Sequence, residues 1–116
     1  MGRNYSEVLQ DILDAIAEIE SFTAGIDFQL FQANREKSLA VVKLLEIIGE
    51  AVKKIPIARR QNYPEIPWKS VAGMKDILVH EYWQVDTAVV WATIQGSLPL
   101  LKTVIMNMLE DEADEK

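Results

Sequence analysis

Apolar residues recur at three- and four-residue steps in the first part of the chain, a spacing that places them on one face of an α-helix. From about Tyr5 to Phe22 the positions on this face are Val8, Leu9, Ile12, Leu13, Ile16 and Ile19. Gly25 suits the left-handed conformation that follows a helix end, and Asp27 suits the cap of a short helical turn. We therefore expect one amphipathic helix, followed in the sequence by a short helix.

A second long helix is predicted from about Arg35 to Lys54. Its apolar residues cover most of the circumference, which is typical of a central, buried helix. They are Leu39, Val41, Val42, Leu44, Leu45, Ile47, Ile48, Ala51, Val52 and Ile55. Its polar residues form a narrow strip on one face, namely Lys43, Glu46, Glu50 and Lys53. Gly49 weakens a helix interior, which indicates that another helix approaches closely there.

Prolines at positions 56, 64 and 67 break the middle of the chain into an irregular connection, in which Ile66-Pro67-Trp68 is an apolar anchor. After Gly73 we expect a short helix that carries the stretch from Lys75 to Tyr82. Asp86 should cap a last helix, which Pro99 is expected to kink. No stretch alternates convincingly at a period of two. The predicted fold is therefore all-α, an antiparallel up-and-down bundle of four to five helices.

Composition indicates an ordinary soluble protein. The 116 residues are 49% apolar and 26% charged, enough for one core. We predict one domain over residues 1–109 and an acidic, disordered tail over residues 110–116. The lack of cysteine fits a reducing cytoplasm. The N-terminus shows no secretory signal, and charges interrupt the longest apolar stretch, so we expect a cytoplasmic protein without a membrane partner.

The charge balance limits the choice of partners. A net charge of −6 counts against a broad nucleic-acid-coating surface, and we expect no DNA partner. Much of the acid lies in the tail, so a small local site stays open. Arg59 and Arg60 form the best short basic patch and are candidates for contacts with an RNA backbone.

The only histidine of the chain, His80, lies in the most informative stretch. On a helix, Asp76 would share its face and could hold the imidazole. Lys75 would lie roughly 7–8 Å away along the axis, so lysine and imidazole could bracket one phosphate. Cleavage of RNA needs a base, an acid and a cation. From the spacing alone, the favoured interpretation is structural, with His80 simply capping or tethering a short surface helix to Asp76.

Other candidate chemistry is weaker. One histidine and no cysteine leave only an all-carboxylate metal site, and we expect neither a metal nor a cofactor. The strip with Lys43, Glu46 and Glu50 is either a solvated face or the floor of a cleft. Four aromatic residues could stack on bases or anchor the core. They are Trp68, Tyr82, Trp83 and Trp91.

In combination these segments resemble the HepT-like HEPN proteins, the toxins of HEPN–MNT toxin–antitoxin systems. The resemblance covers nearly the whole chain. Beyond the opening helix it rests on Leu44-Leu45-Glu46-Ile47-Ile48-Gly49-Glu50-Ala51, Tyr63-Pro64-Glu65-Ile66-Pro67-Trp68, Ala72-Gly73-Met74, the stretch Lys75 to Tyr82, Val85-Asp86 and Trp91. It implies a HEPN-like bundle, a homodimer whose two motifs face a shared cleft, and metal-independent endoribonuclease activity on mRNA or tRNA.

The family motif reads arginine, a polar residue, three further residues, histidine, any residue and tyrosine. By resemblance, Lys75 takes the arginine position and stabilises phosphate charge, while Asp76 orients the imidazole. His80 is then the general acid and base. The resemblance also implies an MNT-type nucleotidyltransferase antitoxin that silences the toxin by transferring AMP to Tyr82. A bulky anionic adduct there would block the cleft and repel RNA phosphate.

The chain departs from the family motif at one position. Lys75 keeps the positive charge but lacks the planar fork with which arginine grips phosphate. A second hypothesis is therefore a catalytically weak HEPN dimer that serves as an interaction module for its nucleotidyltransferase. A third, a plain helical bundle, predicts that His80 is buried or salt-bridged away from any cleft.

Overall fold

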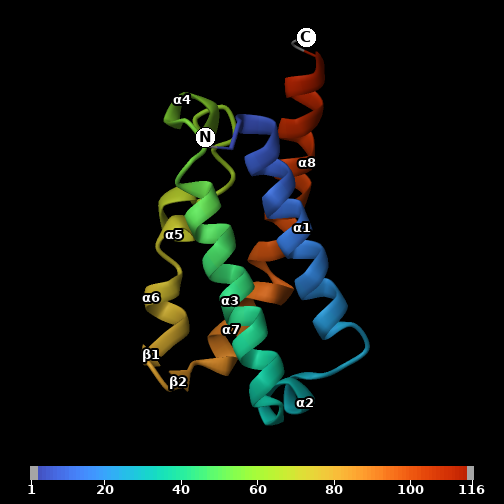
Figure 1. Cartoon of the computed structure of the whole chain (residues 1–116), viewed down its shortest axis with the longest axis vertical. Coiled ribbons are helices and arrows are strands. Elements are labelled where there is room, and N and C mark those ends of the chain that lie inside the picture. Colours follow the sequence, from blue (N-terminus) through green and yellow to red (C-terminus); the bar gives the residue numbers. More distant parts are fainter. Residues whose placement is uncertain (1–2, 115–116) are drawn as a thin grey trace.

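Residues 3–114, which the computed structural model describes, form eight helices and one two-stranded antiparallel hairpin (Figure 1). The elements are α1 (Tyr5–Thr23), α2 (Phe28–Ala33), α3 (Arg35–Val52), α4 (Ile57–Arg60), α5 (Trp68–Ala72), α6 (Lys75–Leu78), β1 (Val79–Glu81), β2 (Gln84–Val85), α7 (Thr87–Gln95) and α8 (Ser97–Asp114). The prediction of an all-α fold is confirmed, with the hairpin as an addition.

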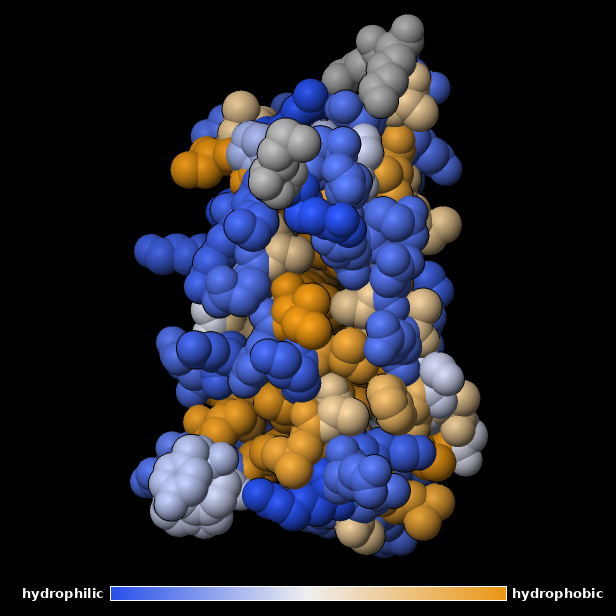
Figure 2. Space-filling model, viewed as in Figure 1, coloured by the Kyte–Doolittle hydropathy of each residue, from blue (hydrophilic) through white to orange (hydrophobic). Residues whose placement is uncertain are grey.

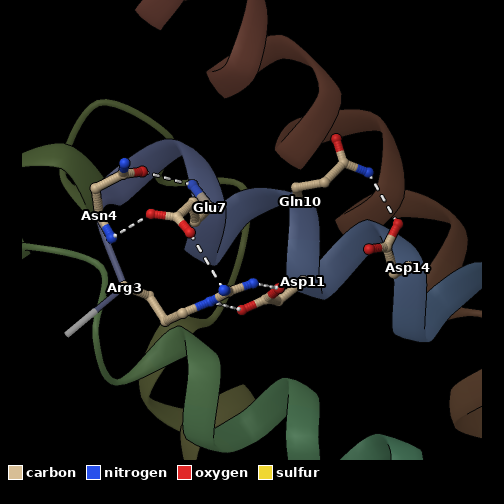
Figure 3. Close-up of polar contacts among 6 residues, drawn as sticks. All are labelled: Arg3, Asn4, Glu7, Gln10, Asp11 and Asp14. Carbon is tan, nitrogen blue, oxygen red and sulfur yellow. Dashed lines mark hydrogen bonds and ion pairs between the residues drawn. The ribbon is translucent and has the colours of Figure 1, made fainter. Parts of the chain in front are cut away.

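The start of α1 is defined by side chains that satisfy its first backbone N–H groups. The Asn4 side chain accepts a hydrogen bond from the Glu7 N–H at 2.8 Å, and the Glu7 carboxylate accepts one from the Asn4 N–H at 3.3 Å (Figure 3). Arg3 adds ion pairs to Glu7 and Asp11. The Arg3 hydrogen bond, with its charge as a smaller cause, holds the pKa of the Asp11 carboxyl below its ordinary value. This capping box explains why the helix begins at Tyr5.

The apolar faces of α1 and α3 meet in the core, with α8 behind them (Figure 1). The fully buried side chains of the two helices are Leu9, Ile12, Ile16, Ile19, Val41, Leu45, Ile48 and Val52. α3 also packs against α5 and α6, so its predicted central place is confirmed. Leu39 and Ile47 are exceptions, because each is 41% exposed on the outer surface of α3.

The close approach expected at Gly49 occurs between α3 and α5. A side-chain Cβ at Gly49 would lie 3.1 Å from the carbonyl oxygen of Val71 and 3.4 Å from that of Ala72. Glycine is therefore required by a neighbouring backbone rather than by its own dihedral angles. The predicted anchor is also confirmed, since Ile66 and Trp68 are buried beside this contact.

The C-terminal segment consists of two helices rather than one kinked helix. α7 and α8 meet at Gly96 at an angle of 43°. Pro99 lies in the first turn of α8, where a backbone N–H has no helical acceptor, so its missing N–H costs nothing. In a continuous helix its ring would clash with the carbonyl of residue 95, four positions earlier, which favours a break between α7 and α8. Within residues 3–114 no single helix is long and apolar enough to cross a membrane, although this bent pair meets the length and composition criteria jointly.

α8 continues through the acidic residues to Asp114, four residues beyond residue 110, the expected start of a disordered tail. Two contacts join this acidic end to the segment around α4. The Tyr63 hydroxyl donates a hydrogen bond to Asp111, and Arg59 pairs with Glu112 at 3.4 Å. These contacts give the acidic side chains partners that the sequence pattern did not reveal. Residues 115 and 116 lie outside the described part of the chain.

Candidate active site

The stretch from Lys75 to Tyr82 is not one helix. α6 ends at Leu78, and Val79 is extended with φ −132° and ψ 117°. The Asp86 N–H donates to the Leu78 carbonyl at 2.7 Å and closes the hairpin. Valine favours extended backbone, which explains why the helix stops here. His80 therefore lies on β1, and the prediction that Asp76 and His80 share a helical face is wrong.

Asp86, not Asp76, is the hydrogen-bonding partner of the imidazole. His80 Nε2 lies 2.9 Å from Asp86 Oδ2. The other carboxylate oxygen, Oδ1, accepts from the Val89 N–H at 3.1 Å and caps α7, as predicted. The sequence indicated only the capping role of Asp86. The β-branched and aromatic residues between Val79 and Val85 are the signal that could have revealed the hairpin, and with it the contact.

A cleft of about 640 Å³ contains six of the predicted site residues. They are Lys43, Glu46, Lys75, Asp76, His80 and Tyr82. α3 contributes one wall, and α6 with the hairpin contributes the other. The His80 side chain is 59% exposed, so the plain-bundle hypothesis of a histidine hidden from any cleft is wrong.

A second groove of about 520 Å³ between α1 and α3 adjoins this cleft and shares Lys43, Glu46 and Lys75 with it. Its floor is apolar, and Figure 2 shows hydrophobic surface along the middle of this face with hydrophilic side chains on both sides. Glu50 lies in this groove and not in the cleft. A hydrogen bond from Lys53 lowers the pKa of Glu50, with smaller contributions from Lys75 and Lys54.

The four aromatic candidates divide into two pairs. Trp68 is buried, and Trp91 packs on Phe31 with ring centroids 5.2 Å apart, so both are structural anchors. Tyr82 is 93% exposed at the turn of the hairpin. Its ring packs edge-to-face with the ring of Trp83, and the two ring centroids are 4.9 Å apart. Trp83 is itself 53% exposed. Only the second pair could meet a ligand.

The hairpin turn is also tied to the body of the protein. Arg35, the first residue of α3, donates a hydrogen bond from Nη2 to the Trp83 carbonyl at 2.9 Å. This bond joins segments 48 residues apart and holds the turn beside the N-terminus of α3. The position of Tyr82 at the rim of the cleft therefore depends on α3 as well as on the hairpin.

Arg59 and Arg60 lie away from the cleft, at the α4 end of the molecule (Figure 1). Arg60 donates hydrogen bonds at 2.9 Å to the carbonyl of Val52, the last residue of α3, and to that of Ile55, three residues further on. Arg59 lies over the ring of Tyr5 at 4.8 Å. Both guanidinium groups thus make intramolecular contacts, and neither reaches the residues gathered around His80.

Proton transfer and anion binding are the chemistry that the cleft can support. An imidazole can take or give a proton, and the ammonium groups of Lys43 and Lys75 can neutralise an anion. Acidic residues also line the cleft, so the positive electrostatic potential is confined to the surroundings of the two lysines. No group of three or more His, Asp or Glu side chains suited to a metal ion occurs within residues 3–114.

Comparison with known proteins gives consistent matches over this chain. The model of the family described as "Ribonuclease HepT-like" matches residues 12–108. A protein of Thermococcus cleftensis named "Probable ribonuclease HepT" is 44% identical over 102 residues, covering 88% of this chain and 93% of that protein. A "Putative RNase" of Methanocaldococcus jannaschii is 41% identical over 109 residues, covering 94% of each. A "Putative RNase" of Caldanaerobacter subterraneus is 38% identical over 104 residues, covering 90% and 93%. No solved structure matches.

Proposed function

This chain belongs to the ribonuclease HepT-like family, and we propose that it is an endoribonuclease that cuts RNA without a metal ion. The observation that carries the proposal is the cleft, in which the exposed His80 lies with Lys43 and Lys75. The three groups match the needs of phosphodiester cleavage, namely proton transfer and neutralisation of charge.

The proposed reaction uses the ribose 2′-hydroxyl as the nucleophile. His80 takes its proton while the 2′-oxygen attacks the adjacent phosphorus, and the 5′-oxygen leaves with a proton from an acid. The products carry a 2′,3′-cyclic phosphate and a 5′-hydroxyl. Lys75 and Lys43 stabilise the charge that develops on the phosphate oxygens.

A homodimer would supply the second proton-transfer group. The chain has one histidine, whereas the reaction needs a base and an acid. Exposed apolar side chains lie on the helices that form the cleft, with Leu39 and Ile47 of α3 each 41% exposed and Ile77 of α6 59% exposed. A second copy could bury this surface and bring its own His80 to a shared cleft. Light scattering at micromolar concentration tests this, because a species with monomer mass only would contradict it.

We further propose that the protein is a toxin controlled by an MNT-type nucleotidyltransferase, and that both act in the cytoplasm. Tyr82 supports this, because its side chain is 93% exposed and also lines the cleft. A modifying enzyme could reach it, and AMP attached there would place a negative charge beside Lys75 and His80. Intact mass should show one added AMP that is absent from Tyr82→Phe.

A second candidate function is a catalytically weak dimer that binds its nucleotidyltransferase. The lysine at position 75 favours it, because one ammonium group grips phosphate less specifically than a guanidinium fork. The Lys75→Arg variant separates the two functions. A wild type that leaves RNA intact beside an active Lys75→Arg variant would support the interaction module, whereas cleavage by both would support the nuclease.

The direct test is cleavage of a labelled RNA by purified protein in EDTA. We expect His80→Ala to lower the rate by about 100-fold or more. Gln84→Ala, an exposed change on the paired strand β2, serves as the control for hairpin integrity and should retain the rate. Equal cleavage by wild type and His80→Ala would overturn the proposal.

A further inference from the structure

We propose that Asp86 is a positioning residue, which binds the Nε2–H of His80 and so reserves the Nδ1 atom for the RNA. The inference rests on the proposed ribonuclease function. It replaces Asp76, the partner indicated by helical spacing, with a residue six positions beyond the histidine. Asp86 does not line the cleft, so it would act on RNA only through the imidazole.

The Asp86 carboxylate is held from two sides. Its backbone N–H is bound to the Leu78 carbonyl at 2.7 Å, which fixes the residue at the base of the hairpin. Its Oδ1 accepts the Val89 N–H at 3.1 Å, which fixes the rotation of the carboxylate against α7. Only Oδ2 then remains for His80, and it lies 2.9 Å from Nε2. The hairpin and α7 thus aim the oxygen before any ligand binds.

Burial strengthens this arrangement. The Asp86 side chain is 23% exposed, whereas that of His80 is 59% exposed. Water therefore competes less at the carboxylate than at the imidazole, and a hydrogen bond to a charged acceptor is stronger than one to a neutral group. The imidazole is consequently held by the protein at Nε2, and the same side chain lines the cleft.

The chemical consequence concerns the tautomer. A neutral imidazole carries one N–H, so donation from Nε2 to Asp86 leaves Nδ1 unprotonated and able to accept a proton. The proton of the 2′-hydroxyl would move to Nδ1 as the bond from the 2′-oxygen to phosphorus forms. The bond from phosphorus to the 5′-oxygen breaks, and that oxygen takes its proton from the imidazolium of the second copy. In each copy Asp86 would stabilise the charged ring.

Other carboxylates of the cleft are less suited to this role. Asp76, Glu46 and Glu81 line the cleft, where they would face the phosphate itself. A carboxylate in that place repels the substrate, whereas Asp86 lies behind the imidazole and outside the lining. Asp86 can therefore support the positive charge of the ring without opposing the binding of RNA.

The test combines NMR with kinetics on the full chain. Because the chain has one histidine, the imidazole region of a ¹H–¹⁵N spectrum contains the signals of a single ring, and these need no assignment to a residue. At alkaline pH, where imidazole is neutral, we expect the wild type to show the proton on Nε2. Asp86→Asn should show a mixed or reversed tautomer, because an amide can donate as well as accept. Asp76→Asn is the matched control and should retain the wild-type spectrum.

The kinetic arm should separate positioning from folding. Asparagine and serine both cap helices well, so Asp86→Asn and Asp86→Ser should keep α7 intact and the thermal midpoint close to that of wild type. We expect the kcat for RNA cleavage to fall by about 100-fold or more in both variants, with KM changed less than about threefold. In the Ser-His-Asp triad of a serine protease, changing the aspartate to asparagine lowers kcat by about 10⁴-fold through the wrong tautomer.

The outcomes distinguish this inference from the proposed function. A wild-type ring protonated on Nδ1 would overturn the inference without any variant. Wild-type kcat in Asp86→Asn would also overturn it. If the wild type leaves RNA intact, the proposed nuclease fails, and the NMR comparison alone decides whether Asp86 sets the tautomer.

Discussion

The two ends of the molecule both present basic and aromatic side chains, but only one leaves them open to a ligand (Figure 1). At the α4 end, Arg60 binds backbone carbonyls, and Trp68 donates its indole N–H to two further carbonyls at 3.0 Å. At the hairpin end, Lys75, His80 and Tyr82 are exposed around a cleft. Two adjacent arginines in a sequence therefore indicate a binding site only when their side-chain N–H groups are not already bound to backbone carbonyls.

The largest expected effect is on stability at the α4 end. Trp68→Ala removes a buried ring and two hydrogen bonds, and should lower the free energy of unfolding by about 3–5 kcal/mol. Trp83→Ala at the hairpin, where the side chain is 53% exposed, should change it by less than about 0.5 kcal/mol. Denaturant unfolding of both variants measures the difference. Equal losses in the free energy of unfolding would contradict the proposed difference between the two ends.

The next effect is on activity at the hairpin end. Lys75→Ala should lower the rate of RNA cleavage by roughly 100-fold, because a cation beside the phosphate is lost. Its free energy of unfolding should stay within about 0.5 kcal/mol of wild type, because the side chain is exposed. Lys69→Ala, an exposed lysine of α5 outside both grooves, is the matched control. A similar loss of rate in both would indicate a general charge effect.

Arg60→Ala should show the opposite pattern to Lys75→Ala. It removes the charged donor from the carbonyls of Val52 and Ile55, and should lower the free energy of unfolding by about 2 kcal/mol. The KM for RNA should not change, because Arg60 does not line the cleft. A rise in KM without loss of stability would restore the sequence-based interpretation of Arg60 as an RNA contact.

The smallest effect concerns the pH dependence of stability at the start of α1. The pKa of Asp11 is lowered in the folded protein by the Arg3 hydrogen bond, so the ionised carboxylate stabilises the fold above its unfolded pKa of about 3.9. This contribution is lost as the pH falls through the lower, folded pKa. Asp11→Asn should therefore be slightly less stable at pH 7 but equal to wild type in acid. Thermal unfolding across pH measures this, and Arg3→Gln should show the same convergence.

The middle of the chain shows why part of the site could not be predicted. Helical spacing identified Lys75, Asp76 and His80 as neighbours, and the cleft does contain all three. It paired the wrong carboxylate with the imidazole, because a four-residue helix and a three-residue strand are too short to leave a clear period. The hydrogen bond between the Asp86 N–H and the Leu78 carbonyl closes the hairpin, and a pairing based on helical spacing takes no account of a hairpin.

The sequence by itself determined the long helices α1 and α3 and two of the helix caps. The apolar period of α1 and α3, the caps at Asp27 and Asp86, and the close approach at Gly49 all follow from local chemistry. Only the tertiary structure decided which polar groups meet across the chain. It paired Asp86 with His80, and it gave Arg59 and Arg60 partners within the chain. Helical spacing predicts which side chains share a face only within a helix, so it cannot predict partners that meet beyond the helix end.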